Sequence, residues 1–116
     1  IGCFAAMEAI RISSAKAFLS RVSSMGSFFR KEFAALGKRY PKLGLKVRGL
    51  GLMMGLEFKD EMTALFLVKL LFDNGVYLVY SGNDPKVLQF LPPLVVTRAV
   101  AGKILKAAER AFAAMG

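Results

Sequence analysis

The feature that most constrains the fold is one long apolar stripe at helical spacing. From residue 15 to residue 37, the large apolar side chains recur at steps of three or four, so they share one face of a helix. The stripe consists of Phe18, Val22, Met25, Phe29, Phe33 and Leu36. Gly26 weakens the middle of such a helix by up to about 1 kcal/mol relative to alanine. We therefore expect the striped face to pack against a partner surface, with Gly37 and Pro41 ending the helix.

The apolar period then changes from that of a helix to that of a strand. Over residues 50–58 every second residue is large and apolar, which predicts one strand with a single apolar face. These residues are Leu50, Leu52, Met54, Leu56 and Phe58. Gly51 and Gly55 belong to the opposite face, where they let another backbone or a ligand come close.

A short helix is predicted before the long one. Residues 2–12 carry apolar side chains at helical spacing, and Ser13 and Ser14 interrupt the pattern. Cys3 lies on the apolar side of this helix, so we expect a buried and unreactive thiol.

Two more helices have recognisable first residues. Asp60 is predicted to cap a helix that ends at Asn74 and Gly75, and Thr97 is predicted to cap the last helix. Arg98 is unfavourable there, because a cation in the first turn opposes the helix dipole. The side chains expected to be buried are Ala64, Leu65, Val68, Leu71 and Phe72 in the first of these helices, and Val100, Ile104, Ala108 and Phe112 in the second.

The remaining apolar segments predict two short strands, over residues 76–80 and 87–90. Residues 81–85 have the composition of a turn, and Pro92 and Pro93 end the second strand. The 116 residues suit a single domain spanning 1–116. We predict an α+β fold with a small three- to four-stranded, mainly antiparallel sheet and helices packed on one face.

Composition excludes several classes of protein. No apolar stretch approaches the roughly 20 residues needed to cross a bilayer, so we expect a soluble protein with no membrane partner. A single cysteine and no histidine leave neither an internal disulfide nor a plausible metal site. No secretory signal pattern is present, and a reducing cytoplasmic location fits best.

The net charge of +9 raises the question of a polyanionic partner. The lysines and arginines are scattered, with one concentration over residues 38–48, and no aromatic residues interleave with them to stack on bases. A solvated basic face is the simpler interpretation, and we do not expect nucleic acid as a partner. A free-standing basic α+β module that binds nucleic acid or another polyanion remains the alternative function.

Three segments together resemble class III aminotransferases, which depend on pyridoxal phosphate. Residues 47–58, VRGLGLMMGLEF, resemble the family strand V-R-G-x-G-L-M-x-G-x-E, and residues 87–97, VLQFLPPLVVT, resemble its late segment V-x-R-F-x-P-P-L-x-x-T. Residues 1–3 and the alanine-rich helix after them resemble the run that follows the family's Gly-Asn-Pro turn. The order and spacing of the segments also match the family, and the likeness covers only its C-terminal third.

The resemblance implies that this chain is the C-terminal small domain and that the large cofactor-binding domain is absent from it. In the family, pyridoxal phosphate forms a Schiff base with a lysine of the large domain and acts as the electron sink for amino-group transfer. None of the lysines here lies in a matching context, so we expect no catalytic residue and no bound cofactor in this chain alone. The implied partners are the large domain of the same enzyme and a homodimer partner.

Gln89 is the one substrate-binding residue that the resemblance indicates. Many members carry an arginine at this position, which clamps the substrate carboxylate, whereas a neutral amide cannot neutralise that charge. We expect an enzyme with this domain to anchor its substrate differently, or to use amines without that carboxylate. The alternative is that Gln89 merely faces solvent at a sheet end. Arg48 also has two interpretations: it could contact an anion or the partner subunit, or it could simply be solvated.

Overall fold

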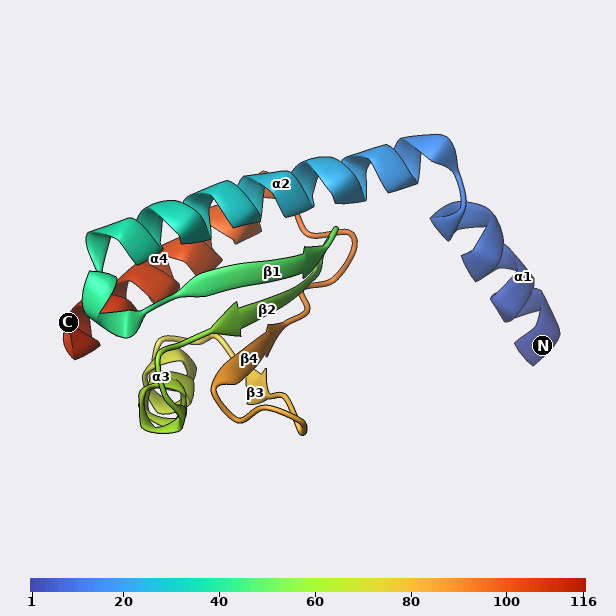
Figure 1. Cartoon of the computed structure of the whole chain (residues 1–116). Coiled ribbons are helices and arrows are strands. Elements are labelled where there is room, and N and C mark those ends of the chain that lie inside the picture. The colour runs from blue at the N-terminus through green and yellow to red at the C-terminus, as the bar shows by residue number, and fades with distance from the viewer.

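The computed structural model describes all 116 residues, which form four α-helices, one short 3-10 helix and four strands (Figure 1). In chain order they are α1 (Gly2–Ser13), α2 (Lys16–Arg39), η1 (Pro41–Leu43), β1 (Lys46–Leu50), β2 (Met53–Glu57), α3 (Glu61–Asp73), β3 (Val79–Tyr80), β4 (Val87–Phe90) and α4 (Arg98–Met115). None of the helices combines the length and the apolar character that spanning a bilayer requires.

The strands form one antiparallel sheet in the order β1-β2-β4-β3. The helices α2, α3 and α4 pack on one face of the sheet and leave the other face uncovered (Figure 1). Apolar residues on the covered face belong to the buried core. On β2, for example, Met54 and Leu56 are buried and Met53 is exposed. The predicted α+β class, with helices on one face of a small antiparallel sheet, is confirmed.

Aromatic rings fill the space between the helices and the sheet. The ring of Phe90 on β4 lies 4.9 Å from that of Phe29 and 5.1 Å from that of Phe33, both on α2 and both edge to face. Phe58, just after β2, meets Phe112 of α4 at 5.9 Å. Edge-to-face contacts of this kind add to the stabilisation from burial alone, so this cluster fixes how α2 and α4 sit on the sheet.

The apolar stripe of α2 is buried only along its second half. Met25, Phe29, Phe33 and Leu36 are buried as predicted, whereas Phe18 and Val22 are only half-buried. The reason is geometric, because the first turns of α2 extend past the edge of the sheet (Figure 1).

The single strand predicted over residues 50–58 is wrong, since a hairpin turn divides it. Gly51 and Leu52 form the turn, with Leu50 of β1 paired to Met53 of β2. Gly51 has φ +57°, a conformation that glycine adopts without a steric penalty. Leu50, predicted to face the core, is 82% exposed at the tip of the hairpin, while Leu52 is buried in the hydrophobic core.

The helix α1 projects from the body of the domain (Figure 1). Every residue from 1 to 14 is exposed, so the prediction of a buried Cys3 is wrong for this chain. The apolar side of α1 is uncovered, since no residue of the helix is buried and α2 is the element that it contacts most. The large exposed side chains on it are Phe4, Met7, Ile10 and Ile12.

Both predicted helix caps are present. The Asp60 carboxylate accepts a 2.7 Å hydrogen bond from the Thr63 amide, and the Thr97 hydroxyl accepts one of 3.3 Å from the Val100 amide. The Arg98 guanidinium lies 4.0 Å from the centre of the Phe28 ring, a cation–π contact that offsets its unfavourable position in the first turn.

Several burial and boundary predictions fail at the rim of the domain. Leu65 and Phe72 on α3 and Val100 on α4 are exposed, because they lie on helix sides that no element covers. The strand predicted over residues 76–80 is shorter, since the Val76 amide bonds the Leu71 carbonyl at 2.8 Å and closes the end of α3 instead.

Candidate functional site

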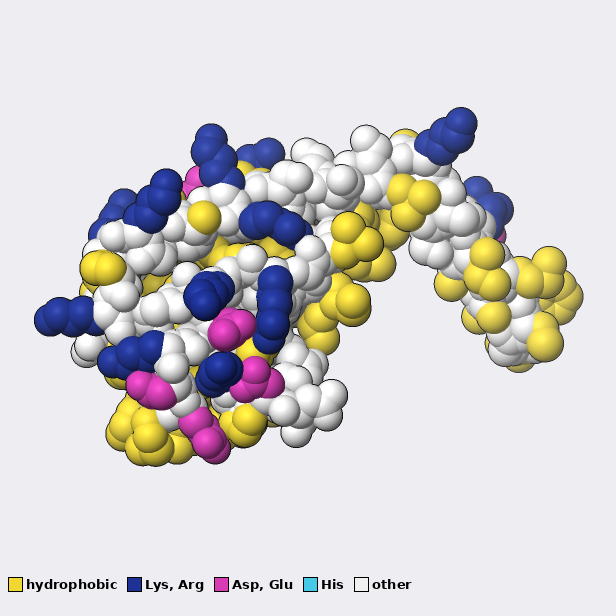
Figure 2. Space-filling model, in the orientation of Figure 1, with side chains coloured by type: hydrophobic (Ala, Val, Ile, Leu, Met, Phe, Trp, Pro, Cys, Tyr) yellow, Lys and Arg dark blue, Asp and Glu magenta, His cyan; other side chains and the backbone are white.

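The helix-free face of the sheet holds a shallow groove of about 450 Å³. Its lining comes from β1, β2, β4 and the segment after β3, and consists of Arg48, Gly49, Met53, Met54, Gly55, Ser81, Val87, Gln89 and Leu91. Basic and acidic side chains alternate over this part of the surface (Figure 2). No acidic residue lines the groove itself.

Strand register sets the polar residues of the groove in a row. Arg48 pairs with Gly55, Gly55 pairs with Gln89, and Gln89 pairs with Val79, so all four lie level across the sheet. Successive residues of a strand point to opposite faces, and directly paired residues share a face. Arg48 and Gln89 therefore face the same side, separated only by a glycine.

Gly55 lies beneath the side chains of Val87 and Arg48. A Cβ atom placed on Gly55 would lie 3.1 Å from Cγ1 of Val87, which is tight, and 3.7 Å from Cγ and 4.0 Å from Nε of Arg48, which are ordinary contact distances. The arginine thus extends from the outer strand over Gly55 toward β4. The close approach that the glycine was predicted to allow is mainly that of Val87.

The charges around Arg48 hold it loosely. Its Nη2 lies 3.4 Å from Oε2 of Glu57 and 3.9 Å from Oδ2 of Asp84, and Glu57 is shared with Lys86, whose Nζ is 3.7 Å from Oε1. Charge-assisted hydrogen bonds normally measure about 2.7–2.9 Å. Sequence reasoning missed Glu57 and Asp84, although the period-two pattern already set Glu57 on the same face as Gly55.

Gln89 lies in the middle of β4 and is half-buried, so it does not face open solvent at a sheet end. Its side chain makes no hydrogen bond within the chain, and neither does the Ser81 hydroxyl. The side chains of Gln89 and Ser81 therefore have unused hydrogen-bonding groups that could bind a ligand in the groove. Residues 81–85 were predicted only as a turn, so the sequence did not indicate that Ser81 would line a groove.

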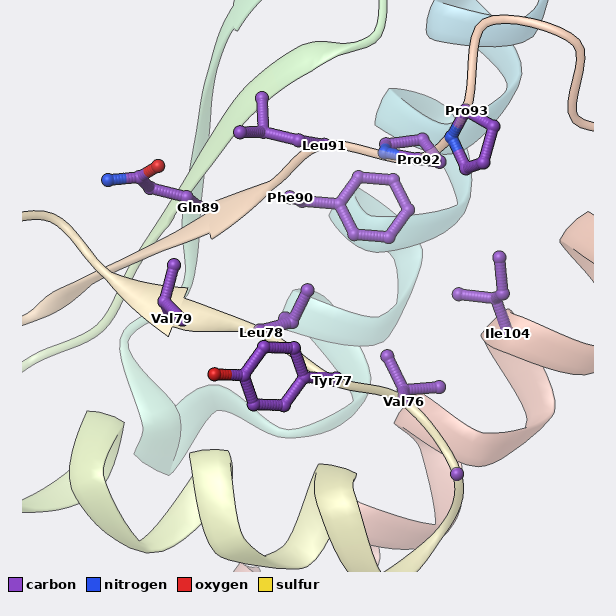
Figure 3. A pocket seen from close by; sticks show the side chains of 11 residues that line it. Val76, Tyr77, Leu78, Val79, Gln89, Phe90, Leu91, Pro92, Pro93 and Ile104 are labelled. Carbon is purple, nitrogen blue, oxygen red and sulfur yellow. The ribbon is translucent and has the colours of Figure 1, made fainter.

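A second hollow of about 300 Å³ lies at the other edge of β4, between β3 and α4 (Figure 3). Its walls are mostly apolar and include Val76, Leu78, Phe90, Pro93 and Ile104, whereas Gln89 points away from the Phe90 ring (Figure 3). Tyr77 is the only titratable residue in the lining and is mainly exposed.

A scan against protein families matches residues 1–112 to aminotransferase class-III. The chain belongs to this family. The match includes both motif-bearing segments, which the structure brings side by side, because β2 pairs with β4 from Met54 opposite Phe90 to Glu57 opposite Val87.

Individual class-III aminotransferases are similar along nearly the whole chain. An acetylornithine aminotransferase of Synechocystis sp. is 33% identical over 99% of this chain, and one of Nostoc sp. is 35% identical over 96%. The crystal structure of N-acetylornithine aminotransferase from Stenotrophomonas maltophilia superposes with a TM-score of 0.84 at 27% identity, over 95% of this chain and 30% of that one. The chain spans 27% and 26% of the length of the two curated relatives.

The residues of this class-III aminotransferase chain do not fit a covalently held pyridoxal phosphate. A Schiff-base lysine has to sit in a protected pocket, where desolvation favours its reactive neutral form. Every lysine here is exposed except Lys86, which is half-buried and paired with Glu57.

Proposed function

We propose that this chain is the C-terminal small domain of a pyridoxal-phosphate-dependent aminotransferase and that it is inactive alone. The observation that carries the proposal is the class-III family match over residues 1–112, in a chain about a quarter as long as its aminotransferase relatives. The remaining length of such an enzyme supplies the lysine and the rest of the cofactor site. The cofactor, when bound there, supplies the electron sink for amino-group transfer.

The exposed side of α1 supports a large domain as the partner. Apolar side chains such as Phe4 and Met7 cover this projecting helix and meet no other part of the chain (Figure 2). Contiguous exposed apolar surface in a protein of this size marks an interaction site. Docking α1 on the large domain would anchor the small domain beside the active site, which it then helps to close. A homodimer partner completes the proposed assembly.

Gln89 is proposed as a substrate contact. Its unpaired amide lies in the groove on the open face of the sheet and can hydrogen-bond a carboxylate, but it brings no charge. The enzyme therefore either takes the substrate's negative charge on another residue or uses amines that carry none. N-acetylornithine is the first donor to assay, because the two curated relatives are acetylornithine aminotransferases.

We also place the enzyme in the cytoplasm. The chain has a single cysteine and no disulfide, as is usual for proteins of a reducing compartment.

The experiment compares this chain with the longer polypeptide that contains it. Each is mixed with pyridoxal phosphate and scanned for the absorbance band of the protein-bound cofactor, then assayed for transfer from N-acetylornithine to a keto acid. We expect the band and the activity only in the longer protein. A stable band or turnover from the 116-residue chain would overturn the proposal, as would a longer protein with neither.

A further inference from the structure

We propose that Arg48 and Gln89 together bind the carboxylate of the substrate, with Arg48 supplying the positive charge that Gln89 lacks. This inference rests on the proposed function, and it selects one of the two arrangements left open there. It assigns a role to a residue on the outermost strand, two strands away from Gln89.

The first requirement is that the side chains of Arg48 and Gln89 can reach the same ligand, and the geometry of the sheet allows this. Neighbouring strands lie about 4.8 Å apart, so Arg48 and Gln89 are separated by about 10 Å at their backbones. Gly55 is the residue between them, and the Arg48 side chain already lies over it, with Nε 4.0 Å from the position a Cβ would take. A side chain at position 55 would fill this path.

Free donors are the second requirement. The Arg48 guanidinium makes two ion-pair contacts, at 3.4 and 3.9 Å, but donates no hydrogen bond within the chain, and its side chain is 60% exposed. By contrast, Arg21 and Arg30 donate to main-chain carbonyls, and Arg11 and Arg39 donate to carboxylates. Arg48 thus combines unused donors with a place in the groove.

The chemistry of the groove selects the ligand. It offers a guanidinium, an amide and a hydroxyl, from Arg48, Gln89 and Ser81, and contains no acid. A planar carboxylate can accept from both the guanidinium fork and the amide. Glu57 and Asp84 lie just outside the lining, and their oxygens are 3.4 and 3.9 Å from Nη2 of Arg48. Both distances exceed the 2.7–2.9 Å of a charge-assisted hydrogen bond, so the guanidinium has closer contacts left to make with a bound carboxylate.

The first test uses the 116-residue chain and a simple probe. Sodium acetate is titrated into the 15N-labelled chain against sodium chloride at equal ionic strength, and the Arg48 Nε–H and Gln89 amide signals are followed. We expect acetate to shift both saturably, with no comparable shift at Arg21 and Arg30. Equal shifts at all arginines, no shift at all, or a stronger response to inorganic phosphate than to acetate would overturn the carboxylate site.

The second test uses the longer enzyme and a pair of substrates that differ by one carboxylate, N-acetylornithine and N-acetyl-1,4-diaminobutane. In Arg48→Gln, we expect kcat/KM for the carboxylated donor to fall about 10- to 100-fold, the usual effect of losing a hydrogen bond to a charged group. The kcat/KM for the donor that lacks the carboxylate should fall much less, because that donor offers Arg48 no anionic partner. Arg48→Lys, which keeps the charge but not the two-pronged geometry, should give an intermediate loss.

Lys46→Gln is the matched control. Lys46 is an exposed cation two residues earlier on β1 and on the same face, but it does not line the groove. A similar loss in this variant would mean that general positive potential, and not Arg48, carries the effect. Equal losses with both donors in Arg48→Gln, or none, would overturn the inference. The cofactor band and the residual turnover report separately on the proposed function.

Discussion

Gly26 and Gly102 both lie inside helices, yet their surroundings are opposite. A Cβ on Gly26 would stand 2.3 Å from the carbonyl oxygen of Gly51, whereas one on Gly102 would meet nothing within 4 Å. The glycine that weakens α2 is therefore what allows this helix to touch the β1–β2 turn. The turn cannot easily retreat, because Gly51 is held at φ +57° between two paired strands.

The two glycines predict opposite effects of alanine. Gly26→Ala should lower the free energy of unfolding by about 1–3 kcal/mol, since overpacking outweighs the gain in helix propensity. Gly102→Ala should raise it by up to about 1 kcal/mol, because only propensity changes. Urea unfolding of the two variants measures both. Stabilisation by Gly26→Ala would contradict the close approach of α2 to the turn.

At the scale of elements, α3 depends on the state of its cap. The hydrogen bond from the Thr63 amide holds the pKa of the Asp60 carboxyl below its usual value. A group with a lowered folded pKa contributes stability that is present above its unfolded pKa and is lost as the pH falls through the folded pKa. We therefore expect acid to loosen the first turn of α3.

The Asp60→Asn variant keeps a side chain that can cap the helix but removes its negative charge. Asparagine caps helices about as well as aspartate but does not titrate in this range. The variant should keep most of the stability at neutral pH and show a smaller loss than the parent as the pH is lowered through the aspartate range. Chemical unfolding across that range tests this, and an unchanged acid dependence would argue against the cap as its source.

The helix α1 forms without a partner in this chain. It has 12 residues and buries none of them, and a helix of that length is marginal in water without packing. Its Glu8–Arg11 ion pair, which lowers the pKa of Glu8, is fully exposed and adds little. The stability of α1 should therefore come from whatever covers its apolar side.

Hydrogen exchange measures directly whether α1 is stable without a partner. In the 116-residue chain, amides of α1 should exchange far faster than those around Phe29 and Phe33 in α2, which serve as the internal reference. In the longer enzyme, the same α1 amides should become protected. Strong protection of α1 in the chain alone would mean that it does not need a large domain.

For the whole molecule, the net charge of +9 calls for a direct test. Basic and acidic side chains are interspersed on the open face of the sheet (Figure 2). Elsewhere, on the helices, some cations form ion pairs with carboxylates, such as Lys69 with Asp73 and Arg39 with Glu109. A surface of this kind attracts polyanions weakly and without selectivity. The groove on this face has no aromatic residue in its lining on which a base could stack.

We therefore expect no discrete mobility shift with duplex or single-stranded nucleic acid at physiological ionic strength. Binding seen at low salt should disappear steeply as salt rises, because it consists of counterion release alone. A salt-resistant complex with a preferred sequence would instead favour the free-standing basic module.

The sequence by itself determined the helices and the family. Apolar side chains repeating at 3.6 or at 2 residues specify helices and strands through geometry that is local to each segment, which is why α2, α3 and α4 and both caps were predictable. The motif segments around Arg48 and Gln89 identified the class-III aminotransferase family in the same local way.

Only the tertiary structure decided which surfaces those segments pack against and which of their residues are exposed. The hairpin at Gly51 was hidden because Leu52 keeps the alternation going through the turn. The turn places Leu50 opposite Met53, on the face of the sheet that no helix covers. Cys3 is exposed because α1 projects from the body of the domain, a placement that helical spacing does not encode. The groove joining Arg48 to Gln89 arises from strand register between residues 41 positions apart, a long-range pairing that no local pattern encodes.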